Sequence, residues 1–333
     1  MSTIRNIAVL GLGTMGHGIA QTFAVGGCRV RGYDQSPEVR GSVAGRIEQN
    51  LRTAAQAGFG EEMAIAPALA RFCVCETEAE AVQGAEFVVE AVAEDLEVKR
   101  QLFSRIESQV SAETILASNT SSFPISDIAA DLSRPRRALI THWFNPPHIV
   151  PLVEVVPGEK TGAEAVEATL ALLRQAGKSP VQLKKEVPGF LVNRIQIAML
   201  REILDLLDRG VADPEEIDRA VKSTIGFRLA AIGPLEVIDF AGLDVTASVF
   251  QNLVADVRSD RELPAALEQA VRSGRFGVKS GEGIYRYTPE AVQAKVSERD
   301  RRFLALLRLF HQGSEPPDAN RAQGISKQPT SEP

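Results

Sequence analysis

The segment from Ile7 to Ala24 constrains the fold of this 333-residue chain more than any other. A short aliphatic run at residues 7–10 is followed by the glycine-rich sequence GLGTMG and then by apolar residues at helical spacing. Strand, turn and helix in this order open a Rossmann-type doubly wound α/β sheet, and the turn brings a pyrophosphate to the free N–H groups of the helix. We expect a dinucleotide site on this turn, built from Gly11, Gly13, Thr14, Met15 and Gly16.

An acidic residue follows the second expected strand, at the position that selects the cofactor. This strand runs from Cys28 to Tyr33, and Asp34 lies 18 residues after Gly16. A carboxylate at this point accepts hydrogen bonds from a ribose 2′-OH and repels a 2′-phosphate. The sequence therefore favours NAD over NADP. The alternative is a glycine-rich turn in another doubly wound fold.

A histidine and a glutamate stand in two later apolar runs where neither is expected. His142 follows the run at 138–140 and precedes a proline-rich turn, so it should lie at the carboxyl end of a strand, where open α/β sheets bind ligands. Glu154 lies in a run that is aliphatic on both faces, and a lone carboxylate there needs a partner. We expect Glu154 to hold the imidazole of His142, which would act as a general base. The alternative is an exposed-edge glutamate and a histidine satisfied at a strand end.

Small polar residues follow another expected strand, at residues 115–117. The sequence SNTSS at 118–122 should form a loop rich in hydrogen-bonding groups at the carboxyl end of the sheet. It could bind a ligand or only cap the next helix. Earlier in the chain, residues 38–72 are Ala-rich and indicate a helical excursion between the second and third strands.

The second half of the chain is expected to be helical. We expect an NAD-binding domain over residues 1–186, a helical domain for substrate binding and dimerisation over 187–311, and a disordered tail over 312–333. From Phe190 onwards apolar residues recur at the spacing of a long, partly buried helix. Asn193 and Arg194 interrupt its first turn, where an amide could hydrogen-bond a substrate or both side chains could be solvated. Residues 274–287 form a glycine-rich loop that holds Lys279.

Composition excludes several classes of protein. The net charge of -6 and the lack of a basic run argue against a nucleic-acid partner. No apolar segment approaches ~18 residues, and the N-terminus enters a strand at once, so we expect neither a membrane span nor a signal peptide. Three widely spaced cysteines indicate reduced thiols in the cytosol. The four histidines do not pair with a cysteine ligand set, so we expect no metal site.

Five ordered motifs together resemble one family. GLGTMG, SNTSS, HWFNP with LVEVV, VPGFLVNR and GVKSGEGIYRY occur in the order typical of the L-3-hydroxyacyl-CoA dehydrogenases, and the resemblance covers roughly residues 4–310. It implies NAD-dependent oxidation of an L-3-hydroxyacyl-CoA to the 3-ketoacyl-CoA in fatty acid metabolism, by a homodimer. In that family the counterparts of His142 and Glu154 are the catalytic base and its partner, and those of Ser121 and Asn193 contact the substrate. The resemblance also adds cofactor contacts from Glu94, Lys99, Asn119 and Lys279, although Lys279 could instead be a surface lysine.

The chain also departs from the family pattern. Trp143 replaces the usual Phe after the histidine, and Val150-Pro151 replaces a common Met-Lys pair. Residues 38–72 contain no lysine to attract CoA phosphates, although Arg40, Arg46 and Arg52 remain. The variant sequences also look like relatives that oxidise small free compounds, namely the carnitine, gulonate and pyridoxine-degradation dehydrogenases. A free hydroxy acid or alcohol is therefore the alternative substrate, while we favour the CoA thioester because most of the family uses it.

Other functions are set aside on particular residues. None of the three tyrosines is followed by a lysine four positions on, so a Tyr-x-x-x-Lys proton relay is absent from the sequence. A non-catalytic NAD-binding protein, such as a sensor or a crystallin, could keep the glycine-rich turn and lose His142 or Glu154. Both are retained here, together with SNTSS and Asn193. We therefore expect an enzyme.

Overall fold

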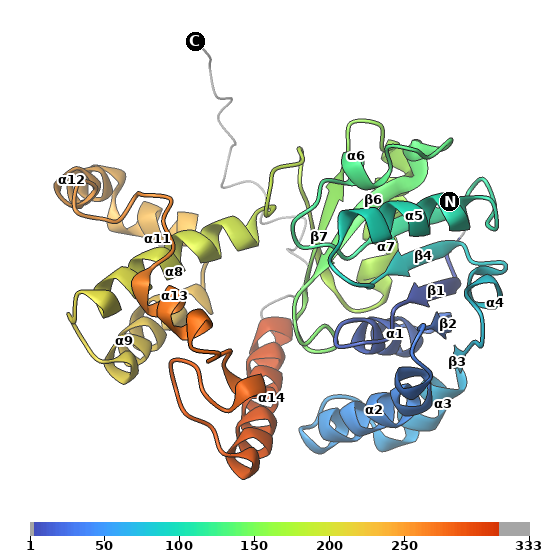
Figure 1. The fold of residues 1–333 in the computed structure, drawn as a ribbon, viewed down its shortest axis with the longest axis horizontal. Coiled ribbons are helices and arrows are strands. Elements are labelled where there is room, and N and C mark those ends of the chain that lie inside the picture. The colour runs from blue at the N-terminus through green and yellow to red at the C-terminus, as the bar shows by residue number, and fades with distance from the viewer. Residues whose placement is uncertain (1–2, 313–333) are drawn as a thin grey trace.

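A computed structural model describes residues 3–312 of the chain. An eight-stranded sheet with helices on both faces forms the N-terminal part, and helices alone form the C-terminal part (Figure 1). This confirms the predicted fold class. The expected tail lies outside the described residues, except that Gln312 is the last residue of α14.

The sheet has the strand order β3-β2-β1-β4-β5-β6-β7-β8. Neighbouring strands are parallel except for β6 and β7, which are antiparallel. Strand order reverses between β1 and β4, and at such a switch point the carboxyl ends of the strands leave a crevice for a ligand. The strands are β1 (Asn6–Leu10), β2 (Arg29–Tyr33), β3 (Phe72–Val74), β4 (Phe87–Glu90), β5 (Ile115–Ser118), β6 (Ala138–Trp143), β7 (Leu152–Pro157) and β8 (Ser179–Gln182).

Helices cover both faces of the sheet because its central strands are apolar on both sides. On one face the core contains Phe23 and Ile47 with Leu173, and on the other it contains Phe103 with Ile128. The first face is covered by α1 (Gly16–Val25), α2 (Pro37–Gln56) and α7 (Ala163–Gln175), and the second by α4 (Glu78–Val82), α5 (Leu96–Glu107) and α6 (Ile125–Ile128). The excursion predicted at 38–72 is helical, with η1 (Glu62–Ala64) and α3 (Ile65–Ala70) after α2, while the turn η2 (Pro135–Arg137) precedes β6.

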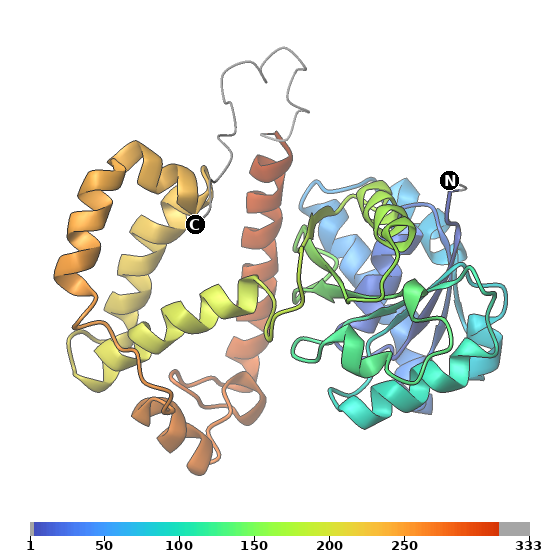
Figure 2. The ribbon, with the colours of Figure 1, turned by 90° about the horizontal axis from the view of Figure 1, so that it is seen from above.

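The C-terminal helices differ from the sheet domain in their burial. The long helix predicted after Phe190 is α8, and it is partly buried as expected, since residues 201–207 are half-buried, although no residue of α8 is fully buried. None of the residues 191–263 is buried, because these helices are spread apart rather than packed around a core of their own (Figure 2). These helices are α8 (Val192–Asp208), α9 (Pro214–Val221), the π-helical turn η3 (Lys222–Gly226), α10 (Phe227–Leu229), α11 (Pro234–Ala241) and α12 (Leu243–Leu253).

The chain then turns back toward the sheet. After α13 (Ala265–Arg272) and the turn η4 (Val278–Ser280), the helix α14 (Pro289–Gln312) stands between the other C-terminal helices and the sheet domain in both views (Figures 1 and 2). Leu304 of α14 is only 3% exposed. The last helix is therefore packed against the rest of the chain.

Candidate active site

The glycine-rich turn between β1 and α1 has the shape of a dinucleotide cradle. Gly11 has φ +87°, and a Cβ there would lie 2.5 Å from the carbonyl oxygen of Ala91. A Cβ on Gly16 would lie 1.7 Å from the oxygen of Gly11, whereas Gly13 faces open space. Glycine is thus required by close backbone approach at two positions, and the third leaves room for a ligand over the N-terminus of α1. These residues fit a dinucleotide pyrophosphate, with Thr14 and Met15 completing the turn.

Asp34 directly follows β2, where the ribose of a dinucleotide is expected. Its carboxylate accepts hydrogen bonds from the backbone N–H of Leu12 (2.7 Å) and of Ser36 (2.9 Å). Arg46 donates to the carbonyl oxygen of Leu12 at 2.6 Å from the neighbouring helix α2. These contacts fix the position of Asp34 relative to the cradle. Its carboxylate can accept hydrogen bonds from the ribose hydroxyls of a bound dinucleotide.

His142 and Glu154 are paired across the antiparallel strands β6 and β7. The two residues are register partners, and Nδ1 of His142 lies 2.7 Å from Oε2 of Glu154. Because a carboxylate only accepts, Nδ1 carries the proton and Nε2 keeps its lone pair. His142 is 4% exposed and Glu154 is fully buried. A buried imidazole with one nitrogen held by a carboxylate can take a proton on the other.

The second oxygen of Glu154 ties this pair to the helical domain. Oε1 accepts from the backbone N–H of Leu191 at 3.0 Å and of Val192 at 2.9 Å, at the start of α8. The helix N-terminus and two N–H donors offset the cost of burying the carboxylate. The residue before them, Phe190, is the non-glycine residue with positive φ (52°) in the described chain, and its ring lies 5.3 Å from that of His142. The connection between the domains is therefore built around the histidine.

The SNTSS loop forms one polar cluster with Glu94. Thr120 and Ser122 donate to Oε1 of Glu94 at 2.7 Å each, and the backbone N–H of Ser121 donates at 2.9 Å. Burial raises the pKa of Glu94, but the hydrogen bonds from Ser122, Thr120 and Ser121 and the charge of Lys99 outweigh it and lower the pKa to about 2. Glu94 is thus an anion that shapes the loop.

Two amides connect this loop to the other parts of the site. Oδ1 of Asn119 accepts from the backbone N–H of Trp143 at 3.0 Å, next to His142. Nδ2 of Asn193 donates to the carbonyl oxygen of Ser121 at 3.3 Å. The structure therefore brings Asn119, Ser121 and Asn193 to the edge of the sheet where His142 lies. Contacts of these side chains with a cofactor or substrate stay predictions.

Lys99 has other partners than the sequence suggested. It is 1% exposed, and its Nζ donates to both oxygens of Glu90 at 2.9 and 3.0 Å and lies 3.2 Å from Glu94. Ser118 also donates to Glu90. These contacts give Lys99 the role of neutralising two carboxylates beneath the loop, and its expected contact with the cofactor stays a prediction.

Lys279 is exposed on the glycine-rich loop of the helical domain. Its Nζ lies 5.3 Å from the ring centre of Phe276 in the same loop. Lys279 therefore contacts a residue of its own loop, and its expected contact with the cofactor stays a prediction.

Sequence reasoning missed Lys178, which lies just before β8. It is 8% exposed, and its Nζ donates to the carbonyl oxygens of Pro147 (2.6 Å) and Val150 (2.9 Å). Burial lowers the pKa of Lys178 to about 8. Lys178 holds the loop that follows His142, and no local sequence pattern signals this contact, because its partners lie 31 and 28 residues earlier in the chain.

The fold and the site together define a class of protein. The dinucleotide cradle lies at the switch point of the sheet, and the histidine–glutamate pair lies at the same carboxyl edge. These two features together are typical of a nicotinamide-dependent dehydrogenase that acts on a CH–OH group. The model of the 3-hydroxyacyl-CoA dehydrogenase NAD-binding domain matches residues 6–187, and that of the C-terminal domain of the same enzymes matches residues 189–287. The chain belongs to the 3-hydroxyacyl-CoA dehydrogenase family, its cofactor is NAD, and the predicted resemblance is confirmed.

Similar proteins include enzymes with different kinds of substrate in their names. The 5-formyl-3-hydroxy-2-methylpyridine 4-carboxylate 5-dehydrogenase of Mesorhizobium japonicum is 41% identical over 314 residues, which are 92% of this chain and 98% of that protein. A Bacillus subtilis protein named "Probable 3-hydroxybutyryl-CoA dehydrogenase" is 37% identical over 285 residues, 85% of this chain and 98% of that protein. A crystal structure of a dehydrogenase with the first of these names, described as an NAD⁺-dependent dismutase, superposes with a TM-score of 0.87 at 38% identity and covers 93% of this chain and 99% of that one.

Metal-binding clusters and membrane-spanning helices are absent from the described residues. No group of three or more His, Cys, Asp or Glu side chains there could hold a metal ion. Within residues 3–312, no helix is long and apolar enough to cross a membrane.

Proposed function

We propose that this protein oxidises a CH–OH carbon with NAD, using His142 as the base and Glu154 as its partner. The observation that carries the proposal is the 2.7 Å contact between these two side chains. Nε2 of His142 takes the hydroxyl proton as the C–H hydrogen leaves with its electron pair, and Glu154 stabilises the imidazolium that results. Bound NAD supplies the hydride acceptor. Ser121 and Asn193 hold the substrate oxygen and favour the charge that develops on it.

The substrate has two candidates. The family motifs favour the CoA thioester of a 3-hydroxy acid, which is the substrate predicted from the sequence alone. The 41% identity over nearly the whole length of a pyridine carboxylate dehydrogenase favours a compact free compound. We propose the compact free compound, which carries a carboxylate. Its reacting group is a CH–OH group or a hydrated aldehyde, and in both the carbon that bears the hydroxyl also carries the hydrogen that is transferred.

A substrate panel tests this choice. Purified protein is assayed with carnitine, gulonate, pyridine carboxaldehydes that carry a carboxylate, and acetoacetyl-CoA in the reverse direction, each followed by NADH absorbance. We expect turnover of at least one free compound and a lower kcat/KM for the thioester. Activity on the thioester alone would refute the free substrate and restore the family's usual one.

We also propose that residues 187–311 act as a substrate and dimerisation domain. Large apolar side chains on α10, α11 and α12 are exposed in the single chain, among them Phe227 (75%), Leu235 (74%) and Phe240 (81%). An exposed apolar surface of this kind on a helical domain is suited to burial against a second copy. We expect sedimentation equilibrium to give a mass near twice 35.9 kDa. A monomer at micromolar concentration would contradict the homodimer.

A cytoplasmic location and a part in fatty acid metabolism stay proposals. The thiols of Cys28, Cys73 and Cys75 are free in the structure, which agrees with a reducing compartment. The part in fatty acid metabolism depends on the substrate that the panel identifies.

A further inference from the structure

The helix α14 lies outside the part of the chain that the family models match. The matched C-terminal domain ends at residue 287, and α14 begins at Pro289. The alignment with the pyridine carboxylate dehydrogenase extends over 314 residues, whereas that with the CoA-named relative ends after 285 although it spans 98% of that protein. The shorter relative therefore has too few residues left to supply a counterpart of α14.

The end of α14 is anchored on the turn after α2. Nη2 of Arg308 donates to the carbonyl oxygen of Ala57 at 2.6 Å, and its guanidinium lies 5.6 Å from the ring centre of Phe59. Gly58 lies between them with φ +78°, and a Cβ there would lie 2.4 Å from the Arg308 guanidinium. The turn thus fits the arginine closely. An interaction of this kind links the C-terminal helix to the sheet domain across about 250 residues of sequence.

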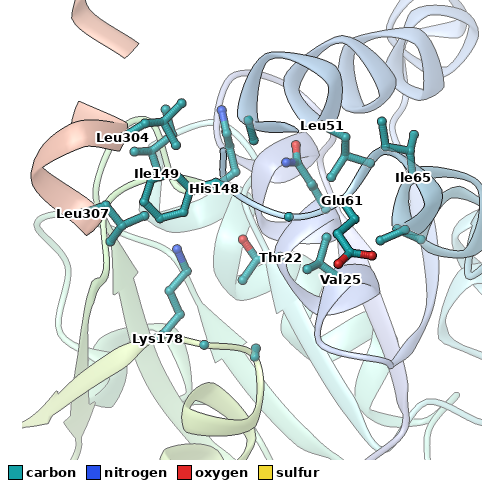
Figure 3. A pocket seen from close by; sticks show the side chains of 18 of the residues that line it. Thr22, Val25, Leu51, Glu61, Ile65, His148, Ile149, Lys178, Leu304 and Leu307 are labelled. Carbon is teal, nitrogen blue, oxygen red and sulfur yellow. The ribbon is translucent and has the colours of Figure 1, made fainter. Parts of the chain in front are cut away.

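The middle of α14 closes a cavity of about 400 Å³ beside the loop that follows His142. Figure 3 shows Leu304 and Leu307 of α14 near Ile149 and His148 of this loop, with Leu51 and Thr22 opposite. We call this space the α14 cavity. Burial, with the nearby His17, Lys178 and Arg299, lowers the pKa of His148 to about 4, so the imidazole is uncharged at neutral pH. Leu304 and Leu307 of α14 close one side of the α14 cavity.

We propose that α14 is a wall that limits the length of the substrate. α14 lies between the sheet domain and the other C-terminal helices (Figures 1 and 2), and its Leu304 and Leu307 line a cavity together with His148 and Ile149 of the loop after His142. A compact carboxylate at His142 needs no room beyond this loop. A CoA thioester has a tail many times longer than its acyl head, and the proposal is that this tail would have to pass the loop that α14 covers. This inference rests on the proposed function and supplies its physical cause.

The test uses one acyl group on tails of increasing length. 3-Hydroxybutyrate and its N-acetylcysteamine, pantetheine and CoA thioesters are assayed with the wild-type protein and with two variants that release α14. Leu304→Glu places a charge at a position that is 3% exposed, and Arg308→Ala removes the anchor on Ala57. Arg302→Ala is the matched control, because this exposed residue pairs with Glu298 of α14 itself. Hydrogen exchange over residues 289–312 reports whether α14 is released.

We expect the ratio of kcat/KM for the CoA thioester to that for 3-hydroxybutyrate to rise at least about tenfold in the released variants and to stay constant in Arg302→Ala. Faster exchange in α14 with an unchanged ratio would overturn the proposal. The full-length double variant Leu304→Glu/Arg308→Ala decides the matter if neither single variant releases the helix. A wild-type preference for the CoA thioester would refute the compact substrate and the wall together, whereas an unchanged ratio after release of α14 would refute the wall alone.

Discussion

His142→Gln is expected to lower kcat by about 10² to 10⁴-fold on whichever substrate the panel identifies, because this is the usual contribution of a positioned general base. Glutamine is close in length to histidine and can accept a hydrogen bond at a similar place, but it cannot take a proton at neutral pH. The side chain is 6% exposed, and the ring centres of Phe144 and Phe190 lie 4.5 and 5.3 Å from that of the imidazole. The substitution keeps most of this packing and removes only the basic nitrogen.

Two measurements separate this effect from loss of structure. NADH binding, followed by fluorescence titration, should be nearly unchanged, because the cradle of Gly11, Gly13 and Gly16 is formed by β1 and α1. Pre-steady-state measurement should show a slower hydride-transfer step, since proton removal accompanies it. Wild-type turnover with intact NADH binding would show that His142 is not the base.

Local sequence patterns were enough to predict the sheet domain. The strand before GLGTMG, the acid after the second strand and the polar loop after Ile115–Ser118 all occur where the chain itself changes from apolar to polar residues. The pairing of His142 with Glu154 was also predictable, because a short antiparallel connection sets the register of two neighbouring strands. Such patterns depend on residues close together in sequence.

Contacts between segments that are distant in the sequence could not be predicted from local sequence patterns. Lys99 lies on α5, whose charged residues would ordinarily be solvated, and only the fold shows that it neutralises the buried Glu90. The hydrogen bonds from Leu191 and Val192 to Glu154 join residues 37 and 38 positions apart through backbone groups that have no sequence signature. How deeply α8 is buried could not be predicted, because its apolar spacing does not say whether the apolar face meets its own chain or a second copy.

Glu154→Gln should reduce kcat by an amount comparable with the loss of the histidine, about 10² to 10⁴-fold, through the orientation of the ring. Oε1 of Glu154 accepts from two backbone N–H groups of residues 191 and 192. A glutamine must keep its carbonyl oxygen there, so its NH₂ group faces Nδ1 of His142. An NH₂ group only donates, which forces Nδ1 to accept and leaves the proton on Nε2, the nitrogen that has to receive the substrate proton.

The tautomer change can be observed independently of turnover. In the wild-type protein we expect a downfield proton NMR signal from Nδ1–H of His142, held by the buried carboxylate, and we expect its loss in Glu154→Gln. Glu159→Gln, at an exposed glutamate just beyond the end of β7, is the matched control and should keep both the signal and turnover. Loss of activity with the Nδ1 proton still present would mean that Glu154 acts on the helical domain through Leu191 and Val192 rather than on the imidazole. Glu154→Ala separates these roles further, because it removes the acceptor of both part-buried N–H groups and should lower the free energy of unfolding by about 1–3 kcal/mol in total.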